Sequence, residues 1–149
     1  MKTQLQALEL WRHSLVASVR GDAPDLSARQ MAILLCVFLG EGPHTVRGLA
    51  KDLNISKPAV SRALDRLGEL GYIRRERDDL DRRNVLVQQT ADGGAFLTAF
   101  ADMITAASAE VASIPSEKAL TFALKAMTDH AQAIEGQTQA EESLMEAAA

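Results

Sequence analysis

The chain has 149 residues, 47% of them hydrophobic, and a formal net charge of −4 at pH 7. This length fits one domain with additional helices, and the acidic total argues against a protein that binds any polyanion. A single cysteine excludes an internal disulfide and fits a reducing cytoplasm. The nearest candidate for a membrane span, residues 31–39, is far too short, and no signal pattern opens the chain. We therefore predict a cytoplasmic protein without a membrane partner.

Two helices are predicted before the central region. The first, within residues 1–25, has an apolar face whose members recur at helical spacing. The second begins after Ser27, where Gln30 completes a capping box, and ends at the breaker sequence GEGP of residues 40–43. The apolar face of the first helix consists of Leu5, Leu8, Trp11, Leu15 and Val19.

Residues 46–66 predict two helices joined by a short turn. Thr45 can cap the first helix, and Asn54 lies in the turn, where a residue often adopts left-handed backbone angles. Ser56 is a natural N-cap for the second helix, and Pro58 falls in its first turn, where the missing N–H costs little. This arrangement is typical of a helix-turn-helix.

The second of these helices separates apolar from polar side chains. Short polar and guanidinium groups on an outward face suit the major groove of DNA, because Arg can pair with both acceptors of a guanine edge. The same pattern also occurs on the solvated face of an ordinary helix, so this alternative stays open at this point. The apolar face carries Val60, Ala63, Leu64, Leu67 and Leu70, and the polar face carries Lys57, Ser61, Arg62, Asp65, Arg66 and Glu69.

A two-stranded hairpin is predicted directly after this helix. Gly71 ends the helix, and residues 72–76 and 84–88 have strand composition. A charged loop, residues 77–83, joins them. A hairpin in this position describes a winged helix, whose wing reaches the flanking DNA backbone or minor groove. A merely solvated turn is the alternative, but the position after the reading helix favours the wing.

Three motifs follow one another in a specific order: SKPAVSRALDRLGELGYIRR at 56–75, DRRNVLV at 81–87, and TADG at 90–93. Together they resemble the MarR family of bacterial winged helix-turn-helix transcription regulators. The resemblance runs from residue 26 to residue 93 and implies that Asp81 holds Arg83 in position within the wing. Gln89 departs from the leucine that the family usually has there, which concerns the packing at the base of the wing.

Basic residues are concentrated on the predicted reading segment. Between Arg47 and Arg83 there are ten basic and seven acidic residues, a net charge of +3, whereas the rest of the chain carries −7. Positive charge on the segment that would face phosphate favours a site-oriented DNA-binding protein. Asp78 and Asp79 do not fit a DNA-facing wing, and the sequence offers no explanation of them.

Two amphipathic helices are predicted within residues 91–135, with Pro115 between them. The terminal segment, residues 136–149, is acidic and rich in alanine, and we expect a frayed helix or disorder there. The apolar positions are Phe96, Leu97, Phe100, Met103, Ile104, Ala107 and Val111 in the first helix, and Leu120, Ala123, Leu124, Met127, Ala131 and Ile134 in the second.

The terminal helices carry more apolar surface than one small winged helix needs. This surface can pack within one chain or against a second copy, and we predict a homodimer because symmetric operators require two-fold proteins. The family resemblance implies the same, with terminal helices interlocking across the dimer. Two reading helices would enter major grooves about 34–36 Å apart, so the predicted target is a pseudo-palindrome in double-stranded DNA.

Other reactive residues are assigned structural roles. Cys36 lies among apolar neighbours and is predicted to be a buried small side chain rather than a redox sensor. Trp11 and Phe100 are candidates for an effector pocket, although core packing is the ordinary role of such residues. Phosphate-loop, Rossmann and nucleophile-elbow motifs are absent, so no enzyme and no cofactor is predicted. The histidines lack metal-ligand spacing, so no metal is predicted at His13, His44 or His130.

The predicted fold is α+β, mainly α. A winged helix-turn-helix at residues 26–90 lies between dimerisation helices at 1–25 and 91–135, and an acidic tail occupies 136–149. The predicted function is a sequence-specific DNA-binding transcription regulator: a dimeric repressor that occludes a promoter, is nucleoid-associated when bound and is released by a small-molecule effector. The alternative is a winged-helix module that docks a protein partner.

Predicted DNA contacts come from the reading helix and the wing. Arg62 is the candidate for base discrimination, while Lys57 and Arg66 are expected to contact phosphate. Arg83 is the principal wing residue. The complete predicted set is Ser56, Lys57, Pro58, Ser61, Arg62, Arg66, Arg77, Asp81, Arg82 and Arg83.

Overall fold

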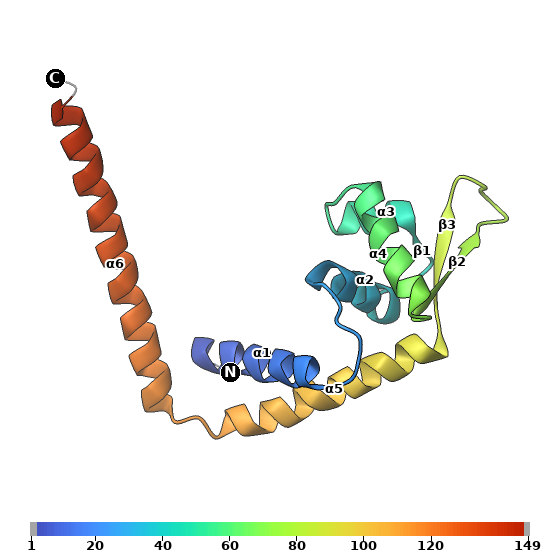
Figure 1. Cartoon of the computed structure of the whole chain (residues 1–149), viewed down its shortest axis with the longest axis horizontal. Helices are drawn as coiled ribbons and strands as arrows, with labels where there is room; N and C mark the ends of the chain where they lie inside the picture. The colour runs from blue at the N-terminus through green and yellow to red at the C-terminus, as the bar shows by residue number, and fades with distance from the viewer. Residues whose placement is uncertain (1–2, 148–149) are drawn as a thin grey trace. The chain divides into compact units, whose positions relative to one another are not determined.

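The computed structural model describes residues 3–147, except for the side chains of residues 116 and 119. The chain is mostly helical with one small sheet (Figure 1), which confirms the predicted class. Its elements in chain order are α1 (Gln4–Arg20), α2 (Ala28–Leu39), β1 (His44–Thr45), α3 (Val46–Asp52), α4 (Lys57–Glu69), β2 (Ile73–Arg77), β3 (Val85–Gln89), α5 (Ala91–Ala112) and α6 (Ser116–Ala147).

The chain divides into two compact units. One comprises residues 17–103, and the other combines the chain up to residue 16 with the residues from 104 onward. The division therefore falls inside α5, whereas the sequence analysis places a boundary between residues 90 and 91. The physical reason is that Phe96 and Leu97, in the first turns of α5, pack against the core of the first unit.

Side chains at the helix starts act as the predicted caps. Ser27 Oγ accepts a hydrogen bond from Gln30 N at 3.2 Å, while Ser27 N donates to Gln30 Oε1 at 2.9 Å. Thr45 caps α3 in a similar way, and Ser56 Oγ accepts from Ala59 N at 3.3 Å at the start of α4. Each cap supplies an acceptor for an N–H group that has no partner inside its helix.

The turns on either side of α4 also follow the sequence. Asn54, between α3 and α4, has φ = 50°, and Gly71, just after α4, has φ = 74°. Pro58 lies in the first turn of α4. The left-handed conformation at both turns, which Asn and Gly tolerate best, lets the chain reverse sharply before and after the reading helix.

The sheet has three antiparallel strands in the order β1-β3-β2. β2 and β3 form the predicted hairpin, with Arg75 opposite Val87 and Arg77 opposite Val85. β1 pairs with the other edge of β3, and His44 lies opposite Val87. β1 is not predicted from the sequence, because a strand of two residues shows no periodicity.

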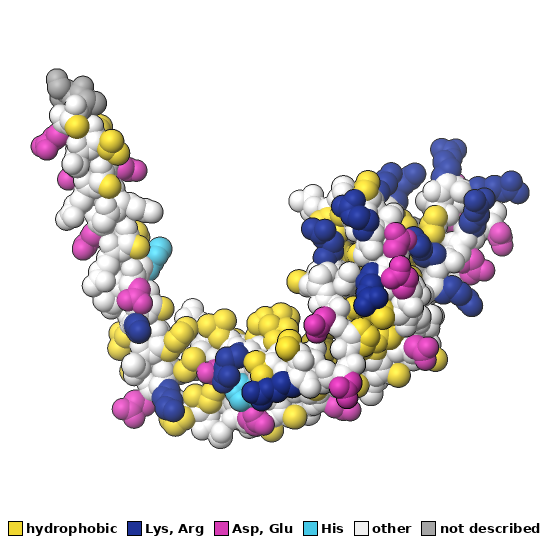
Figure 2. All heavy atoms as spheres, in the orientation of Figure 1, with side chains coloured by type: hydrophobic (Ala, Val, Ile, Leu, Met, Phe, Trp, Pro, Cys, Tyr) yellow, Lys and Arg dark blue, Asp and Glu magenta, His cyan; other side chains and the backbone are white. Residues whose placement is uncertain are grey.

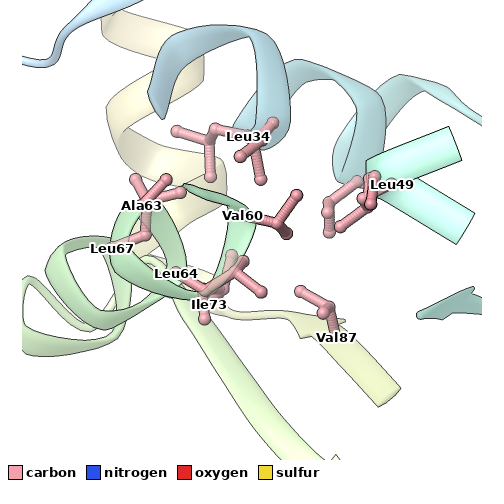
Figure 3. Packing of buried hydrophobic residues seen from close by; sticks show 11 residues of the cluster. Leu34, Leu49, Val60, Ala63, Leu64, Leu67, Ile73 and Val87 are labelled. Carbon is pink, nitrogen blue, oxygen red and sulfur yellow. The ribbon is translucent and has the colours of Figure 1, made fainter. Parts of the chain in front are cut away.

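The hydrophobic core of the 17–103 unit lies where α2, α3 and α4 meet the sheet (Figure 3). Val60, Leu64 and Leu67 from α4 are fully buried, and Ile73 and Val87 cover them from the sheet. Burying each large apolar side chain stabilises the fold by about 1.5–3 kcal/mol. Because one whole stripe of α4 is buried, its rotation about its own axis is determined, and its polar stripe faces solvent.

Thr90 links the end of α4 to the start of α5. Its Oγ donates a hydrogen bond of 2.6 Å to the Gly71 carbonyl oxygen and accepts one of 3.0 Å from Gly93 N. Close by, the rings of Tyr72 and Phe96 stack with 4.7 Å between their centroids. The TADG motif is therefore a structural joint that anchors the base of the hairpin to α5.

Gln89, at the base of the wing, serves as a helix cap. Its Nε2 donates a hydrogen bond of 2.9 Å to the Val37 carbonyl oxygen. Val37 lies in the last turn of α2, where carbonyl groups lack partners within the helix. The base of the wing is thus held to α2 by this polar contact in addition to the packing of Val87 in the shared core.

In the other unit, α1 and α5 are joined by side chains. His13 Nδ1 of α1 lies 2.7 Å from Glu110 Oε2 of α5. Ser14 is buried and its Oγ donates a hydrogen bond of 2.8 Å to the Leu10 carbonyl oxygen, so its burial leaves no unsatisfied hydroxyl. Val111 of α5 is also fully buried.

The segment after Gly136 is helical up to Ala147. α6 continues without a break from Ser116 to Ala147, whereas the sequence analysis expects fraying or disorder beyond Gly136. Glycine inside a helix costs about 1 kcal/mol relative to alanine, and the alanine, glutamate and glutamine around it are good helix formers. Residues 148 and 149 of the predicted tail lie outside the described residues.

The prediction that no apolar run has the length of a membrane span also needs correction. By length and composition alone, α5 would suffice to cross a membrane. Eight of its 22 residues are alanines, and the helix still carries Asp92, Asp102 and Glu110. Core helices of soluble proteins pass the same test, so the finding is weak evidence for a span.

The two adjacent glycines of α5 give a matched test of this packing. A Cβ at Gly93 would overlap the Tyr72 carbonyl oxygen and come 2.8 Å from Phe38 Cζ, whereas one at Gly94 would make ordinary contact, 3.7 Å from Phe38 Cε1. We predict that Gly93→Ala lowers the free energy of unfolding by about 1–3 kcal/mol. Gly94→Ala should raise it by up to about 1 kcal/mol. Urea denaturation checks both, and equal effects would contradict the close approach at Gly93.

Candidate nucleic-acid interface

The outward face of α4 carries exposed cations. Lys57 and Arg62 are exposed, and within residues 3–147 neither takes part in an ion pair. Ser61, one turn after Lys57, is half-buried. Arg66 is 46% exposed and its Nη1 lies 3.7 Å from Glu69 Oε2, a surface pair that is too weak to withdraw the guanidinium from another partner.

The first turn of α4 presents two more of the predicted contacts. Ser56 and Pro58 are both exposed, so both can approach a ligand that lies against this end of the helix. Ser56 already accepts a hydrogen bond as N-cap, but its hydroxyl proton is free to be donated. A helix N-terminus is also a favourable place for an anion such as phosphate.

Two aspartates shape the tip of the wing, the loop of residues 78–84. Asp78 Oδ1 accepts a hydrogen bond of 2.9 Å from Leu80 N, and Asp81 Oδ1 accepts one of 3.1 Å from Arg83 N. Both are Asx turns, in which a carboxylate satisfies a backbone N–H two residues later. Asp78, which the sequence leaves unexplained, is therefore a turn-forming residue, whereas the structure gives no contact that explains Asp79.

Asp81 also faces the Arg83 side chain, although weakly. Arg83 Nε lies 3.9 Å from Asp81 Oδ1, and the Arg83 side chain is 86% exposed. A pair this long and this exposed contributes little energy. Asp81 therefore orders the backbone that presents Arg83 and leaves its guanidinium in solvent.

The basic residues of this unit all reach the surface. Figure 2 shows the Lys and Arg side chains gathered over α3, α4 and the wing. Arg77 and Arg82 of the predicted set belong to this group. The basic residues that are concentrated between Arg47 and Arg83 in the sequence are thus all exposed on this unit. The exposed basic residues from Arg47 to Arg83 are Arg47, Lys51, Lys57, Arg62, Arg66, Arg74, Arg75, Arg77, Arg82 and Arg83, and the unit also exposes Arg20 and Arg29.

Two further contacts of this surface are absent from the sequence analysis. Arg75 Nη2 of β2 lies 2.6 Å from Asp65 Oδ1 of α4. Arg74 Nη2 donates a hydrogen bond of 2.7 Å to Gln88 Oε1 on the neighbouring strand. The strand alternation could have indicated which face each arginine occupies, but the partners lie 10 and 14 residues away and depend on the folded hairpin.

The two residues proposed for an effector pocket have different surroundings. Trp11 is 57% exposed on α1, while Phe100 is 6% exposed and stacks on Phe96 with 6.5 Å between ring centroids. A cavity of about 400 Å³ in the α1–α5–α6 unit is lined by neither of them but by residues that include His13, Glu110 and Lys118. Phe100 therefore has the core-packing role that the sequence analysis names as the ordinary one.

Cys36 and the histidines are placed as follows. Cys36 is half-buried against the core, so it is less enclosed than the sequence analysis predicts. His44 lines a groove of about 370 Å³ beside β3, together with Pro43 and Leu86. His130 is exposed on α6. Across the residues that the structure describes, no group of three His, Cys, Asp or Glu side chains is placed to hold a metal ion.

Comparison with known proteins identifies this arrangement. The sequence profile of the MarR family matches residues 26–85. A comparison with curated protein sequences found no match. Among solved structures, a MepR mutant from S. aureus bound to an oligodeoxyribonucleotide is similar, with a TM-score of 0.63, 19% identity and coverage of 88% of this chain and 94% of that one.

Two more solved structures share the fold over nearly the whole chain. YusO from Bacillus subtilis has a TM-score of 0.62 and 23% identity, covering 87% of this chain and 90% of that one. A crystal structure of MarR has a TM-score of 0.58 and 21% identity, covering 88% and 96%. Residues 26–85 are therefore matched in sequence to the MarR family, and the flanking helices share the fold of these solved structures.

Proposed function

We propose that this protein is a sequence-specific regulator that binds double-stranded DNA through α4 and the wing. The observation that carries the proposal is the set of exposed cations on the outer stripe of α4, next to a wing whose backbone is ordered to present Arg83. Of these cations, Lys57 and Arg62 form no ion pair within residues 3–147. DNA binding by the S. aureus MepR mutant, which has the same fold, supports the assignment. The reading helix enters the major groove and the wing contacts the neighbouring backbone or minor groove.

Different residues have different roles in this proposal. Arg62 lies in the middle of the outer stripe of α4 and discriminates a base, because its fork of donors matches the guanine edge. Lys57, Ser56 and Arg66 lie nearer the helix ends and contact phosphate or short polar groups there. Wing arginines add phosphate and minor-groove contacts.

A homodimer is the proposed state that binds DNA. The apolar stripe predicted on α1 is largely exposed in the single chain: Leu8 by 55%, Trp11 by 57% and Val19 by 70%. On α6, Leu124 is 56% exposed and Met127 is 70% exposed. Stripes of this length rarely face water in a stable monomer, so we propose that a second copy covers them. Two-fold symmetry then makes the operator a pseudo-palindrome.

The regulatory role that we propose is repression by occlusion of a promoter in the bacterial cytoplasm, with nucleoid association in the bound state. A small-molecule effector would release the DNA by favouring a dimer in which the two reading helices have a different separation. The match of residues 26–85 to the MarR family supports this part of the proposal.

Selection of bound fragments from the parent genome, followed by gel shifts on the selected duplex, tests the proposal. An acidic protein serves as competitor, because a winged helix can also dock a protein partner. Retention of the duplex against excess competitor is the expected result. Loss of all duplex binding in the presence of the acidic protein would instead favour a protein-interaction module.

Arg62→Ala tests base discrimination. We expect a loss of about 1–3 kcal/mol in binding free energy on the selected duplex, together with relaxed preference at one base position. Fluorescence anisotropy on a panel of single-base variants measures both. Arg29→Ala, which removes an exposed arginine from α2, is the control and should change neither. An equal loss on every duplex would reduce Arg62 to a phosphate contact.

Arg83→Ala tests the wing. The variant should bind more weakly, and the slope of log affinity against log salt concentration should fall by roughly one, because one phosphate contact is lost. Arg83→Lys keeps the charge and should keep the slope. A slope that is unchanged in Arg83→Ala would remove this residue from the interface.

Leu124→Glu tests the dimer. A carboxylate on the apolar stripe of α6 should shift the protein toward a monomer, since burying an unpaired charge at an interface costs several kcal/mol in order of magnitude. Sedimentation velocity gives the oligomeric state. Gln132→Glu adds the same charge away from the stripe and should leave the dimer intact. A dimer that survives both substitutions would place the interface elsewhere.

A further inference from the structure

We propose that the ion pair between Asp65 and Arg75 is a positioning device for DNA reading: it withholds the Asp65 carboxylate from Arg62 and fixes the wing to α4. The inference rests on the proposed DNA-binding function and adds to it two residues outside the predicted contact set. Neither Asp65 nor Arg75 needs to contact DNA in this role, so both are positioning residues.

The first observation is which arginine the carboxylate contacts. Asp65 lies three residues after Arg62 on α4, a spacing at which an arginine and an aspartate readily pair on a helix surface. The structure instead places Asp65 Oδ1 at 2.6 Å from Arg75 Nη2, and within residues 3–147 Arg62 forms no ion pair. The carboxylate that would compete for Arg62 is therefore already engaged with another cation.

The second observation is the strand geometry that brings Arg75 to this position. Alternate residues of a strand share a face, so Arg75 lies on the same face of β2 as the buried Ile73. Its cross-strand partner is Val87, which is also buried. Arg75 therefore extends the packing of β2 against α4 one step beyond the core, at the point where the wing leaves the body of the unit.

Arg74 shows that this placement is specific. It belongs to the opposite face of β2 and donates its hydrogen bond to Gln88, across the hairpin, instead of to α4. Of these two adjacent arginines, one stiffens the wing internally and the other ties the wing to the reading helix. Exchange of the two faces by a change of register would lose both contacts.

The exposure of the pair indicates that stability is not its main effect. The Arg75 and Asp65 side chains are 39% and 55% exposed, and ion pairs in such surroundings add little to folding free energy. The effect of the pair on DNA binding is expected to be larger. An unneutralised carboxylate on the outer stripe of α4 would repel phosphate and attract Arg62. Neutralisation by Arg75 removes both effects.

A double-mutant cycle with Arg75→Gln and Asp65→Asn tests the proposal on the selected duplex. Arg75→Gln should weaken binding about tenfold and reduce base discrimination at the position read by Arg62, since the freed Asp65 captures that guanidinium. The same substitution made in the Asp65→Asn background should cost no more than about threefold and should keep discrimination, because no carboxylate is left. Arg75→Lys retains the charge and should restore most of the affinity.

Other outcomes are decisive against the proposal. An equal loss from Arg75→Gln in both backgrounds would make Arg75 an ordinary phosphate contact. A loss that is accompanied by a matching fall in melting temperature in both backgrounds would make the pair a stability element. The Arg66–Glu69 pair, which lies within α4, is the control: Glu69→Gln should leave discrimination unchanged. Failure of the wild-type protein to bind any duplex would instead overturn the proposed function itself.

Discussion

Burial of one stripe of α4 is the interaction on which the rest of the interface depends. Val60, Leu64 and Leu67 are held between α2, α3 and the sheet, and a helix with one stripe so enclosed cannot rotate about its axis. The outward direction of Lys57 and Arg62 follows from this packing. Their exposure is therefore a consequence of the core, although neither residue belongs to it.

Polar side chains then fix what the core leaves free. Thr90 ties the loop after α4 to α5, and Gln89 ties β3 to the end of α2. Asp81 orders the wing tip, and Arg75 joins the wing to α4. Each of these contacts satisfies a backbone or charged group at a joint between elements, so the wing has a defined position relative to the reading helix.

The same contacts explain why acidic residues occur within a basic surface. A carboxylate that accepts a backbone N–H, as Asp78 and Asp81 do, shapes a loop without directing an unpaired charge toward phosphate. Asp65 is neutralised by a neighbouring arginine. These contacts leave the formal net charge of +3 over residues 47–83 unchanged, and they give Asp65, Asp78 and Asp81 each a partner within the unit.

The helix-turn-helix, the caps at Ser27, Thr45 and Ser56, and the hairpin after Gly71 could be predicted from the amino-acid sequence, because these features depend on residues within one or two turns of each other. Tertiary structure decided the two-residue strand β1, the cap that Gln89 provides for a helix 52 residues away, and the pairing of Asp65 with Arg75 instead of Arg62. Such contacts depend on how elements distant in the chain pack together. A local pattern of residue types does not predict that packing.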